Sequence, residues 1–492
     1  MRQFNRTPIL PAMLILCTAW SANHAGEPLE FPIGQRQLFL DDRDIERIEN
    51  VRRAMHQPVK RGAVIKPELA WETALQVRCA PVWDPRQKLF KIWMVTSTPV
   101  PGVGATTYAQ SEDGITWTKP ILRQWEYEGS LENNFVCPAP KLQWPANAIL
   151  NVVYHPDAAD PNRRFKGFLG ANRRQPMVSP DGIRWKVLET APLPSNDESN
   201  LSYDKTTRTF IATLKTGGPH GRAHAIATSS DFESWTKPRL FFSADDLDQE
   251  LGLKHIAARF ADARLQQPVA NDPSRYNVDV YNIGVFRYES MVIGLAAMYH
   301  ATGPSADGTN TDGFHLVQLA AGRDLKTLHR LGDRKTFIGP SPVGDGAFDL
   351  TQILPPSDAV VHGDELWFYY TGLKYRSRPE NPDPDVGAIC LAVLRRDGFI
   401  SFDAADSEGI VQTRPFVVPG GKLHVNADVP NGQLIVELLG SDGKVVGRST
   451  PIKRDHPDAE VQFGHSHAEL AGKVASLQFR LMNGSIYSYW FE

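Results

Sequence analysis

The sequence has little cysteine and no long apolar run after its first 25 residues, and both absences exclude whole classes of protein. Four cysteines among 492 residues are too few for a disulfide framework to hold the fold. No later segment approaches the roughly 20 apolar residues that a membrane helix needs. The formal charge is only −3, whereas a nucleic-acid partner would favour a basic face. We therefore expect no disulfide scaffold, no membrane span and no nucleic-acid partner.

The first 25 residues have the pattern of a secretory signal peptide. Arg2 and Arg6 precede an apolar run over residues 9–20, and a short stretch of small and polar residues follows this run. The run is too short to cross a bilayer as a stable helix. We expect residues 1–25 to be removed and the mature protein to be exported to the periplasm or the extracellular space.

What the sequence does contain is a repeated turn. The stretch at residues 111–120 reads Ser-Glu-Asp-Gly-Ile-Thr-Trp-Thr-Lys-Pro, and close copies stand at 179–185 and 230–238. Weaker copies follow at 322–328 and 396–399. Asp caps a tight turn, Gly accepts positive φ, and the following Trp suits a half-buried strand. We interpret these marker turns as structural punctuation of a repeat architecture and not as an active site.

Each marker turn ends a unit of short strands. In the first unit we expect strands at 75–83, 89–95 and 107–110 before the turn. Similar units begin near residues 133, 201, 280 and 350. Four short strands per unit are typical of a propeller blade. The sequence thus predicts an all-β fold, with a five-bladed β-propeller over residues 26–402. The uneven spacing of the turns leaves six blades open, and the strand at 38–40 is expected to complete the last blade.

The strand pattern changes after about residue 402. Alternating strands at 421–427, 433–439 and 475–491 are separated by polar turns. This pattern predicts a small antiparallel β-sandwich over residues 403–492.

Carboxylates stand where the innermost strand of every expected blade begins. Because these strands line the central axis of a propeller, their first residues should converge on one face. Glycoside hydrolysis needs paired carboxyl groups, and crowded acids raise one another's pKa, so that one can stay protonated as a general acid. Solvated loop acids, or acids that bind a structural cation, are the alternative interpretation. The acids of this expected ring are Glu72, Glu132, Asp197, Glu198, Asp279 and Asp349.

Other polar side chains near these acids are candidates for binding a sugar. Arg222 could hold a carboxylate and His220 a sugar hydroxyl, although a plain surface loop explains both equally well. His300 closes a strand and could equally be a capped strand end. No zinc-ligand spacing, phosphate loop or nucleophile elbow is present in the sequence, so we predict no cofactor. The remaining binding candidates lie next to the acids and are Asn133, Asn134 and Tyr281.

The chain resembles secreted five-bladed propeller proteins related to glycoside hydrolase families 32 and 43, of the kind abundant in planctomycete-like bacteria. In those hydrolases the first three blades supply a base or nucleophile, an orienting acid and a general acid. By resemblance, Glu72 would be the base or nucleophile, Glu132 or Asn133 the orienting residue, and Asp197 or Glu198 the general acid. The first acid is Glu where those families use Asp. The resemblance rests on residues 37–42, 71–72, 111–120, 133–134, 218–222, 230–238 and 481–487.

Three functions follow from these observations. The leading hypothesis is a secreted glycoside hydrolase that acts on a poly- or oligosaccharide, with Glu72, Asp197 and Glu198 as catalytic residues. The second is a carbohydrate-binding propeller without catalysis. The third is a sialidase-like hydrolase, which requires an arginine triad; Arg222 is the one clear arginine of the expected funnel.

Overall fold

The computed structural model describes residues 27–100, 103–137, 147–305, 308–463 and 471–492. The signal peptide expected at residues 1–25 lies outside these ranges and stays a prediction. Within them the chain is mostly β-strand, with one α-helix, α1 (Asp246–Ala261). None of the described helices is long and apolar enough to cross a membrane. The predicted all-β class is confirmed.

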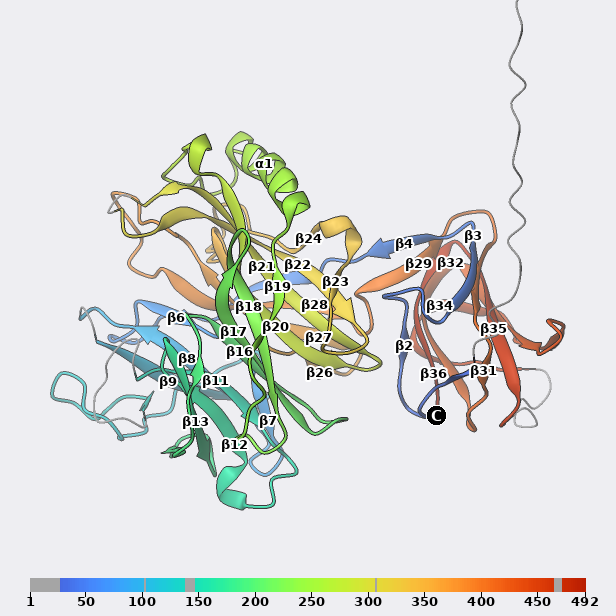
Figure 1. Ribbon diagram of the computed structural model, residues 1–492, viewed down its shortest axis with the longest axis horizontal. Coiled ribbons are helices and arrows are strands. Elements are labelled where there is room, and N and C mark those ends of the chain that lie inside the picture. The colour runs from blue at the N-terminus through green and yellow to red at the C-terminus, as the bar shows by residue number, and fades with distance from the viewer. Residues whose placement is uncertain (1–26, 101–102, 138–146, 306–307, 464–470) are drawn as a thin grey trace, which may run out of the picture.

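The described strands between residues 59 and 395 fall into five groups of antiparallel strands, of which the first and fifth form one sheet through a parallel pairing of Ala74 with Gly387 (Figure 1). The first group contains β6 (Ala74–Gln76), β7 (Val82–Asp84), β8 (Leu89–Ser97), β9 (Gly104–Ser111) and β10 (Phe135–Val136). The second contains β11 (Ile149–Tyr154), β12 (Phe165–Leu169), β13 (Arg173–Ser179), β14 (Lys186–Val187) and β15 (Leu193–Pro194). The third contains β16 (Ser199–Asp204), β17 (Thr209–Gly218), β18 (Gly221–Ser229) and β19 (Arg239–Ser243).

The fourth group contains β20 (Asn277–Tyr288), β21 (Met291–Pro304), β22 (Thr311–Gly322), β23 (His329–Arg330) and β24 (Thr336–Ile338). The fifth contains β25 (Gln352–Leu354), β26 (Val360–His362), β27 (Glu365–Leu373), β28 (Gly387–Arg395) and β5 (Val59–Ile65). First strands of neighbouring groups lie side by side: the Asn151 amide donates to the Ser199 carbonyl, and the Ser202 hydroxyl donates to the Val285 carbonyl. This is the propeller-type arrangement that the repeat predicts.

The strand that completes the fifth group differs from the one that the sequence predicts. The fifth group is completed by β5, in which Ile65 pairs opposite Ile389 of β28. The stretch at 38–40 was expected there, but β2 (Gln37–Leu38) pairs with β36 (Gly484–Phe491). Leu38 and Leu40 pack on a propeller core, whereas Phe39 packs on the C-terminal core. The run is apolar on both faces because it lies between two units.

The C-terminal strands form a second unit with its own core (Figure 1). In the view of Figure 1 this unit lies on the right and is joined to the propeller near β4 (Arg52–Met55) and β29 (Ile400–Ala404), which pair with each other. The strands between residues 29 and 55 pair with it, although the sequence predicts a propeller from residue 26. Besides β2 and β36, its strands are β1 (Leu29–Glu30), β3 (Ile45–Glu49), β4 (Arg52–Met55), β29 (Ile400–Ala404), β30 (Gly409–Thr413), β31 (Phe416–Val417), β32 (Leu423–Gly440), β33 (Val445–Arg448), β34 (Ile452–Glu460) and β35 (Val474–Met482).

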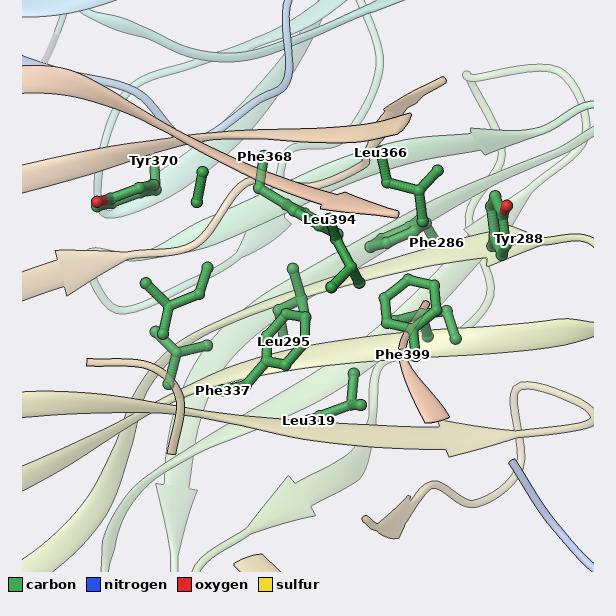
Figure 2. Packing of buried hydrophobic residues seen from close by; sticks show 14 of the residues in the cluster. Phe286, Tyr288, Leu295, Leu319, Phe337, Leu366, Phe368, Tyr370, Leu394 and Phe399 are labelled. Atoms are coloured by element: carbon green, nitrogen blue, oxygen red, sulfur yellow. The ribbon is translucent and has the colours of Figure 1, made fainter. Parts of the chain in front are cut away.

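A large apolar cluster joins the fourth and fifth groups (Figure 2). The Phe337 ring lies 5.8 Å from Phe368 and 6.1 Å from Phe399, measured between ring centroids. Each fully buried large apolar side chain contributes about 1.5–3 kcal/mol of transfer free energy. The two groups are therefore held together by side-chain packing. Other labelled members of the cluster are Phe286, Leu295, Leu319, Leu366 and Leu394.

The marker turns link neighbouring groups. In the first copy the Asp113 carboxylate accepts hydrogen bonds from the backbone N–H groups of Ile115 (2.8 Å) and Thr116 (2.7 Å). The Gly114 carbonyl then accepts a 2.8 Å hydrogen bond from Tyr369 of the fifth group. In the second copy Trp93 of the first group donates to the Gly182 carbonyl at 2.6 Å. These Asp and Gly residues thus serve turn geometry and packing between groups.

Candidate functional site

A cavity of about 820 Å³ lies where the third and fourth groups begin. It opens at the N-terminal ends of β16 and β20, which is the face where the sequence predicts a funnel. Two carboxyl groups and several cations line it together with amides. The lining residues that matter below are Asp197, Lys215, Arg222, Arg275, Asp279 and Asn310.

Asp197 presents an exposed carboxylate to this cavity. It stands two residues before β16 in a left-handed backbone conformation (φ 87°), and its side chain is 57% exposed. The buried Lys215 of β17 donates to Asp197 Oδ2 at 2.9 Å. The Lys215 ammonium also lies 3.9 Å from the ring centroid of Tyr281, and burial lowers its pKa. Asp197 is therefore held in place by a cation while it faces solvent.

Asp279 presents a buried carboxyl group to the same cavity. It accepts hydrogen bonds from the backbone N–H of Arg222 (3.2 Å) and from the Arg222 guanidinium (3.2 and 3.3 Å). Burial nevertheless raises the pKa of Asp279 above its usual value. A Cβ at Gly221 would lie 2.9 Å from Asp279 Oδ2, so glycine allows the backbone to approach this carboxyl. A carboxyl with a raised pKa beside a cavity has the property that a general acid needs.

Glu198 lies beneath the cavity and is ionised. Its carboxylate accepts a 2.7 Å hydrogen bond from Arg78 Nη2, a second bond from Arg78 Nε, and a 2.9 Å bond from the Asn282 amide. Burial alone would raise the pKa of Glu198, but Arg78 and the other donors lower it to about 2. These hydrogen bonds favour a carboxylate that fixes Arg78 over the protonated general acid that the sequence suggests for this position.

Two arginines near the cavity, the half-buried Arg376 and the buried Arg174, make no ion pair among the residues that the structure describes. Arg376 donates to the Thr311 carbonyl (3.1 Å), to the Tyr281 hydroxyl (3.3 Å) and to the Gln352 side chain (3.3 Å). Arg174 donates to the Ser199 hydroxyl and to backbone carbonyls, including that of Asp197. Burial lowers the pKa of Arg174 to about 10. All their acceptors are neutral groups.

The expected ring of acids does not form around this cavity, and Glu72 is one reason. Its side chain accepts hydrogen bonds from the backbone N–H groups of Glu68 (3.0 Å) and Leu69 (3.2 Å) and pairs with Lys119 at 2.6 Å. Glu72 thus closes the turn that precedes β6. It does not line the cavity at β16 and β20.

The acid and amides expected for the second blade precede a different kind of strand. Glu132, Asn133 and Asn134 stand before β10, which pairs with β9 at the edge of the first group; the inner strand of the second group is β11. Glu132 is exposed and pairs with Arg123 at 2.6 Å. The buried Asn133 and Asn134 amides donate to backbone carbonyls at 2.7 and 2.8 Å. The prediction that a second unit begins near residue 133 is therefore wrong, because the strand that follows pairs with the first group.

Asp349 precedes β25 as expected but faces another cavity. Its carboxylate pairs with Lys60 at 2.7 Å and accepts a 2.8 Å hydrogen bond from the Tyr370 hydroxyl. These residues line a separate cavity of about 420 Å³. Asp349 is therefore not brought together with Asp197 and Asp279.

The two expected histidines differ in position. His220 stands in the tight connection between β17 and β18 and lies 3.1 Å from the Asp246 carboxylate of α1. His300 is buried in β21, where Nδ1 donates to the Met298 carbonyl (3.1 Å) and Nε2 faces His255 (3.0 Å). Burial lowers the pKa of His300 to about 3, so it is neutral. Neither histidine lines the cavity.

The ring of Tyr281 lies close to three cations, Lys215, Arg222 and Arg376. Its ring is 5.9 Å from Tyr299 and 4.7 Å from His315 by centroid distance, and burial raises the pKa of its hydroxyl. The sequence reasoning missed the cations around it because only acids were sought at the ends of the inner strands. One signal was available: Arg78 stands two residues after the end of β6, the inner strand of the first group. The missed residues are Arg78, Arg174, Lys215 and Arg376.

Among the described residues, no group of three or more His, Cys, Asp or Glu side chains gathers as metal ligands. The carboxylates near the cavity are engaged with arginine and lysine. The cavity is therefore built of ion pairs and amides.

No family model and no curated protein matches this chain. Among solved structures, it is similar to a glycoside hydrolase family 43 arabinoxylan arabinofuranohydrolase from Bacillus subtilis, with 11% identity and a TM-score of 0.42 over 87% of this chain and 99% of that chain. A family 32 β-fructofuranosidase from Bombyx mori gives 9% identity and a TM-score of 0.41 over 88% and 93%. An N-acetylgalactosamine deacetylase from F. plautii gives 12% and 0.40 over 71% and 97%. These identities and TM-scores assign no activity to the chain.

Proposed function

We propose that the protein is a carbohydrate-active hydrolase that cleaves an O-glycosyl bond in the cavity at β16 and β20. The observation that carries this proposal is the presence of two carboxyl groups in unlike environments, Asp279 buried and Asp197 exposed. Pairs of titratable groups whose environments differ in this way are suited to separate acid and base roles. Glycoside hydrolysis requires such a pair.

In this proposal Asp279 is the general acid. Its raised pKa favours the protonated form, which would donate a proton to the leaving oxygen. Asp197 is the base or nucleophile, because its carboxylate is accessible and is oriented by Lys215. Glu198 is a positioning residue that acts through Arg78. Compared with the sequence hypothesis, Asp197 stays in the catalytic set, Asp279 joins it, and Glu72 and Glu198 leave it.

A carbohydrate-binding protein without catalysis is the second candidate. It is favoured by one observation: each carboxylate at the cavity is engaged by a cation, Asp197 by Lys215, Glu198 by Arg78 and Asp279 by Arg222. A carboxylate that is held in an ion pair is less free to exchange a proton. Binding without bond cleavage would identify this function.

The sialidase-like alternative is favoured by the arginines near Tyr281, but it lacks an activated nucleophile. Arg222 and Arg376 both approach Tyr281, with guanidinium carbons 5.4 Å from its ring centroid. Sialidases use a tyrosine nucleophile. Here, however, burial raises the pKa of Tyr281, which disfavours the phenolate. We therefore rank this function below the other two.

The test is a hydrolysis assay on a panel of oligosaccharides, scored by release of reducing ends. We expect Asp197→Asn and Asp279→Asn each to lower kcat at least about 100-fold, the usual scale for loss of an acid or base. Glu132→Gln, at an exposed ion pair outside the cavity, is the matched control and should keep full activity. Full activity of both aspartate variants would exclude this site. Tight binding with no release by the unmodified protein would establish the second candidate. Export of the mature protein is proposed from residues 1–25 alone.

A further inference from the structure

The cavity is surrounded by more cations than acids. Three cations pair with three acids, as described above. The acceptors of Arg174 and Arg376 within the described part of the chain are neutral groups. Arg275, which also lines the cavity, is exposed and makes no ion pair within the described residues. Two further described carboxyl groups lie beside these cations: Asp312 accepts a hydrogen bond from the backbone N–H of Ser377, next to Arg376, and Asp272 interacts electrostatically with Arg275. Among the described residues, six cations therefore face five acids, so a small excess of positive charge remains even when all five carboxyl groups are ionised.

Two of these cations share the same pair of aromatic rings. The Arg222 guanidinium carbon lies 5.4 Å from the Tyr281 centroid and 5.0 Å from the Tyr299 centroid. The corresponding distances for Arg376 are both 5.4 Å. Like charges that are close together in a partly buried site repel each other more strongly than they would in water. The tyrosine faces relieve part of this repulsion, and a bound anion would relieve more.

The lining of the cavity offers donors as well as charge. Arg222 Nη2 reaches only a 3.4 Å contact with Asn310, so this edge of the guanidinium is weakly engaged. The amide side chains of Asn196, Asn277 and Asn310 also line the cavity. Planar guanidinium groups bind carboxylates through two parallel hydrogen bonds, and amides suit sugar hydroxyls. The same cavity thus offers sites for an anion and for a sugar ring.

We infer that the cavity binds a sugar that carries a carboxylate, with Arg222 as the contacting residue and Arg376 and Arg275 as sources of the surplus positive potential. This inference rests on the proposed function for the identity of the cavity, but binding and turnover are measured separately. A neutral sugar would leave Arg376 without an ion-pair partner among the described residues. A sulfated sugar would provide the same charge and can also accept two hydrogen bonds from a guanidinium group, so the experiment compares sulfated with carboxylated probes.

Calorimetry on the full-length protein tests this inference. The probes are tetrasaccharides of galacturonate, glucuronate and mannuronate, each compared with its carboxyl-reduced neutral form. We expect at least one acidic probe to bind at least about 10-fold more tightly than its neutral form and to lose affinity when salt is raised. Equal affinity for all acidic and neutral pairs would overturn the inference. Tighter binding of a sulfated tetrasaccharide than of every carboxylated one would also overturn it.

Substitutions test which arginine supplies the positive charge that binds the acidic probe. Arg376→Gln should weaken binding of the acidic probe about 10-fold and leave that of the neutral form unchanged, and Arg376→Lys should recover part of the loss because it keeps the charge. Arg123→Gln, at an exposed ion pair outside the cavity, is the control. Should Arg376→Gln unfold the protein, Arg275→Gln, at an exposed position, provides the same comparison. A loss that is equal for acidic and neutral probes contradicts the assignment.

The two proposals fail in different ways. Binding of an acidic probe without cleavage would contradict the proposed hydrolysis and support the binding of a carboxylated sugar. Cleavage of neutral oligosaccharides, with no preference for acidic ones, would support the proposed hydrolysis and contradict the binding of a carboxylated sugar. Asp197→Asn and Asp279→Asn should keep or strengthen binding of the acidic probe, because each removes a negative charge from the cavity.

Discussion

Arg78 and Glu198 form a two-point ion pair at the centre of the propeller, with Arg78 Nη2 2.7 Å from Glu198 Oε1 and Arg78 Nε bonded to Glu198 Oε2. Both side chains are almost fully buried. Arg78 follows the inner strand of the first group, and Glu198 precedes that of the third. The pair thus connects groups that are far apart in the sequence and lies directly beneath the cavity. The pair has two consequences for stability, one at neutral pH and one in acid.

Glu198→Gln should destabilise the protein strongly. Removing one partner of a buried ion pair leaves an uncompensated charge and costs about 3–5 kcal/mol. Urea unfolding at pH 7 measures this loss, and Glu132→Gln, at an exposed pair, should stay within about 0.5 kcal/mol of the unmodified protein. An equal effect of the two substitutions would contradict the structural role of Glu198.

The same pair predicts a stability change at low pH. The pKa of Glu198 is lowered to about 2 in the folded state, so its contribution is fully present above the unfolded pKa of about 4.3 and is lost as the pH falls toward 2. The unmodified protein should lose about 3 kcal/mol from this group over that window. Glu198→Gln should lose correspondingly less over the same window. Parallel pH dependence of the two proteins would contradict the lowered pKa.

Asp279 predicts the alkaline limb of the activity profile. Its pKa is raised by burial, and a general acid must be protonated, so kcat/KM should fall as the pH rises through this pKa. Asp279→Asn should lose most activity toward natural glycosides and lose less toward dinitrophenyl glycosides, whose leaving group needs no proton. The control is Asp197→Asn, which should lose activity toward both kinds of substrate. An equal loss for both substrates in Asp279→Asn would exclude the role of general acid.

The fold was more predictable from the sequence than the site. The marker turns at Asp113 and Asp181 are local: Asp, Gly and Trp satisfy their own hydrogen bonds within a few residues, so the pattern is readable. The site depends on which strand is innermost, and this depends on pairing between distant residues. Glu132 shows the limit, because the two-residue strand β10 after it resembles the start of a blade but pairs back onto β9. Arg376 shows a second limit of prediction from sequence, because its place at the cavity depends on contact with Tyr281 of a different group.

Buried histidines predict a loss of stability in mild acid. Burial lowers the pKa of His300 to about 3, whereas the unfolded side chain takes up a proton below about 6.5. The unfolded state therefore gains protons first, and this residue should destabilise the fold by about 2 kcal/mol between pH 7 and pH 5. His300→Gln should show a shallower pH dependence of unfolding, and the exposed His329→Gln should match the unmodified protein. Identical slopes for His300→Gln and the unmodified protein would contradict a neutral buried imidazole.

Gly182 predicts how tightly the marker turns hold neighbouring groups together. A Cβ at Gly182 would overlap Cζ2 of Trp93, whose indole donates to the Gly182 carbonyl. Gly129 has the same φ of 80°, but a Cβ there would have no neighbouring atom within 4 Å, so it is a matched control. The left-handed backbone costs both alanine variants about 1–2 kcal/mol, and Gly182→Ala adds about 1–3 kcal/mol of overpacking.

Urea unfolding followed by tryptophan fluorescence separates the backbone cost, which both alanine variants share, from the overpacking against Trp93 in Gly182→Ala. We expect Gly182→Ala to unfold at a clearly lower urea concentration than Gly129→Ala and to change the native emission spectrum, because Trp93 must move to admit the methyl group. Gly129→Ala should keep the native spectrum. Equal midpoints and equal spectra would mean that the second marker turn does not depend on its contact with the first group, and that the repeated Asp-Gly motif serves turn geometry alone.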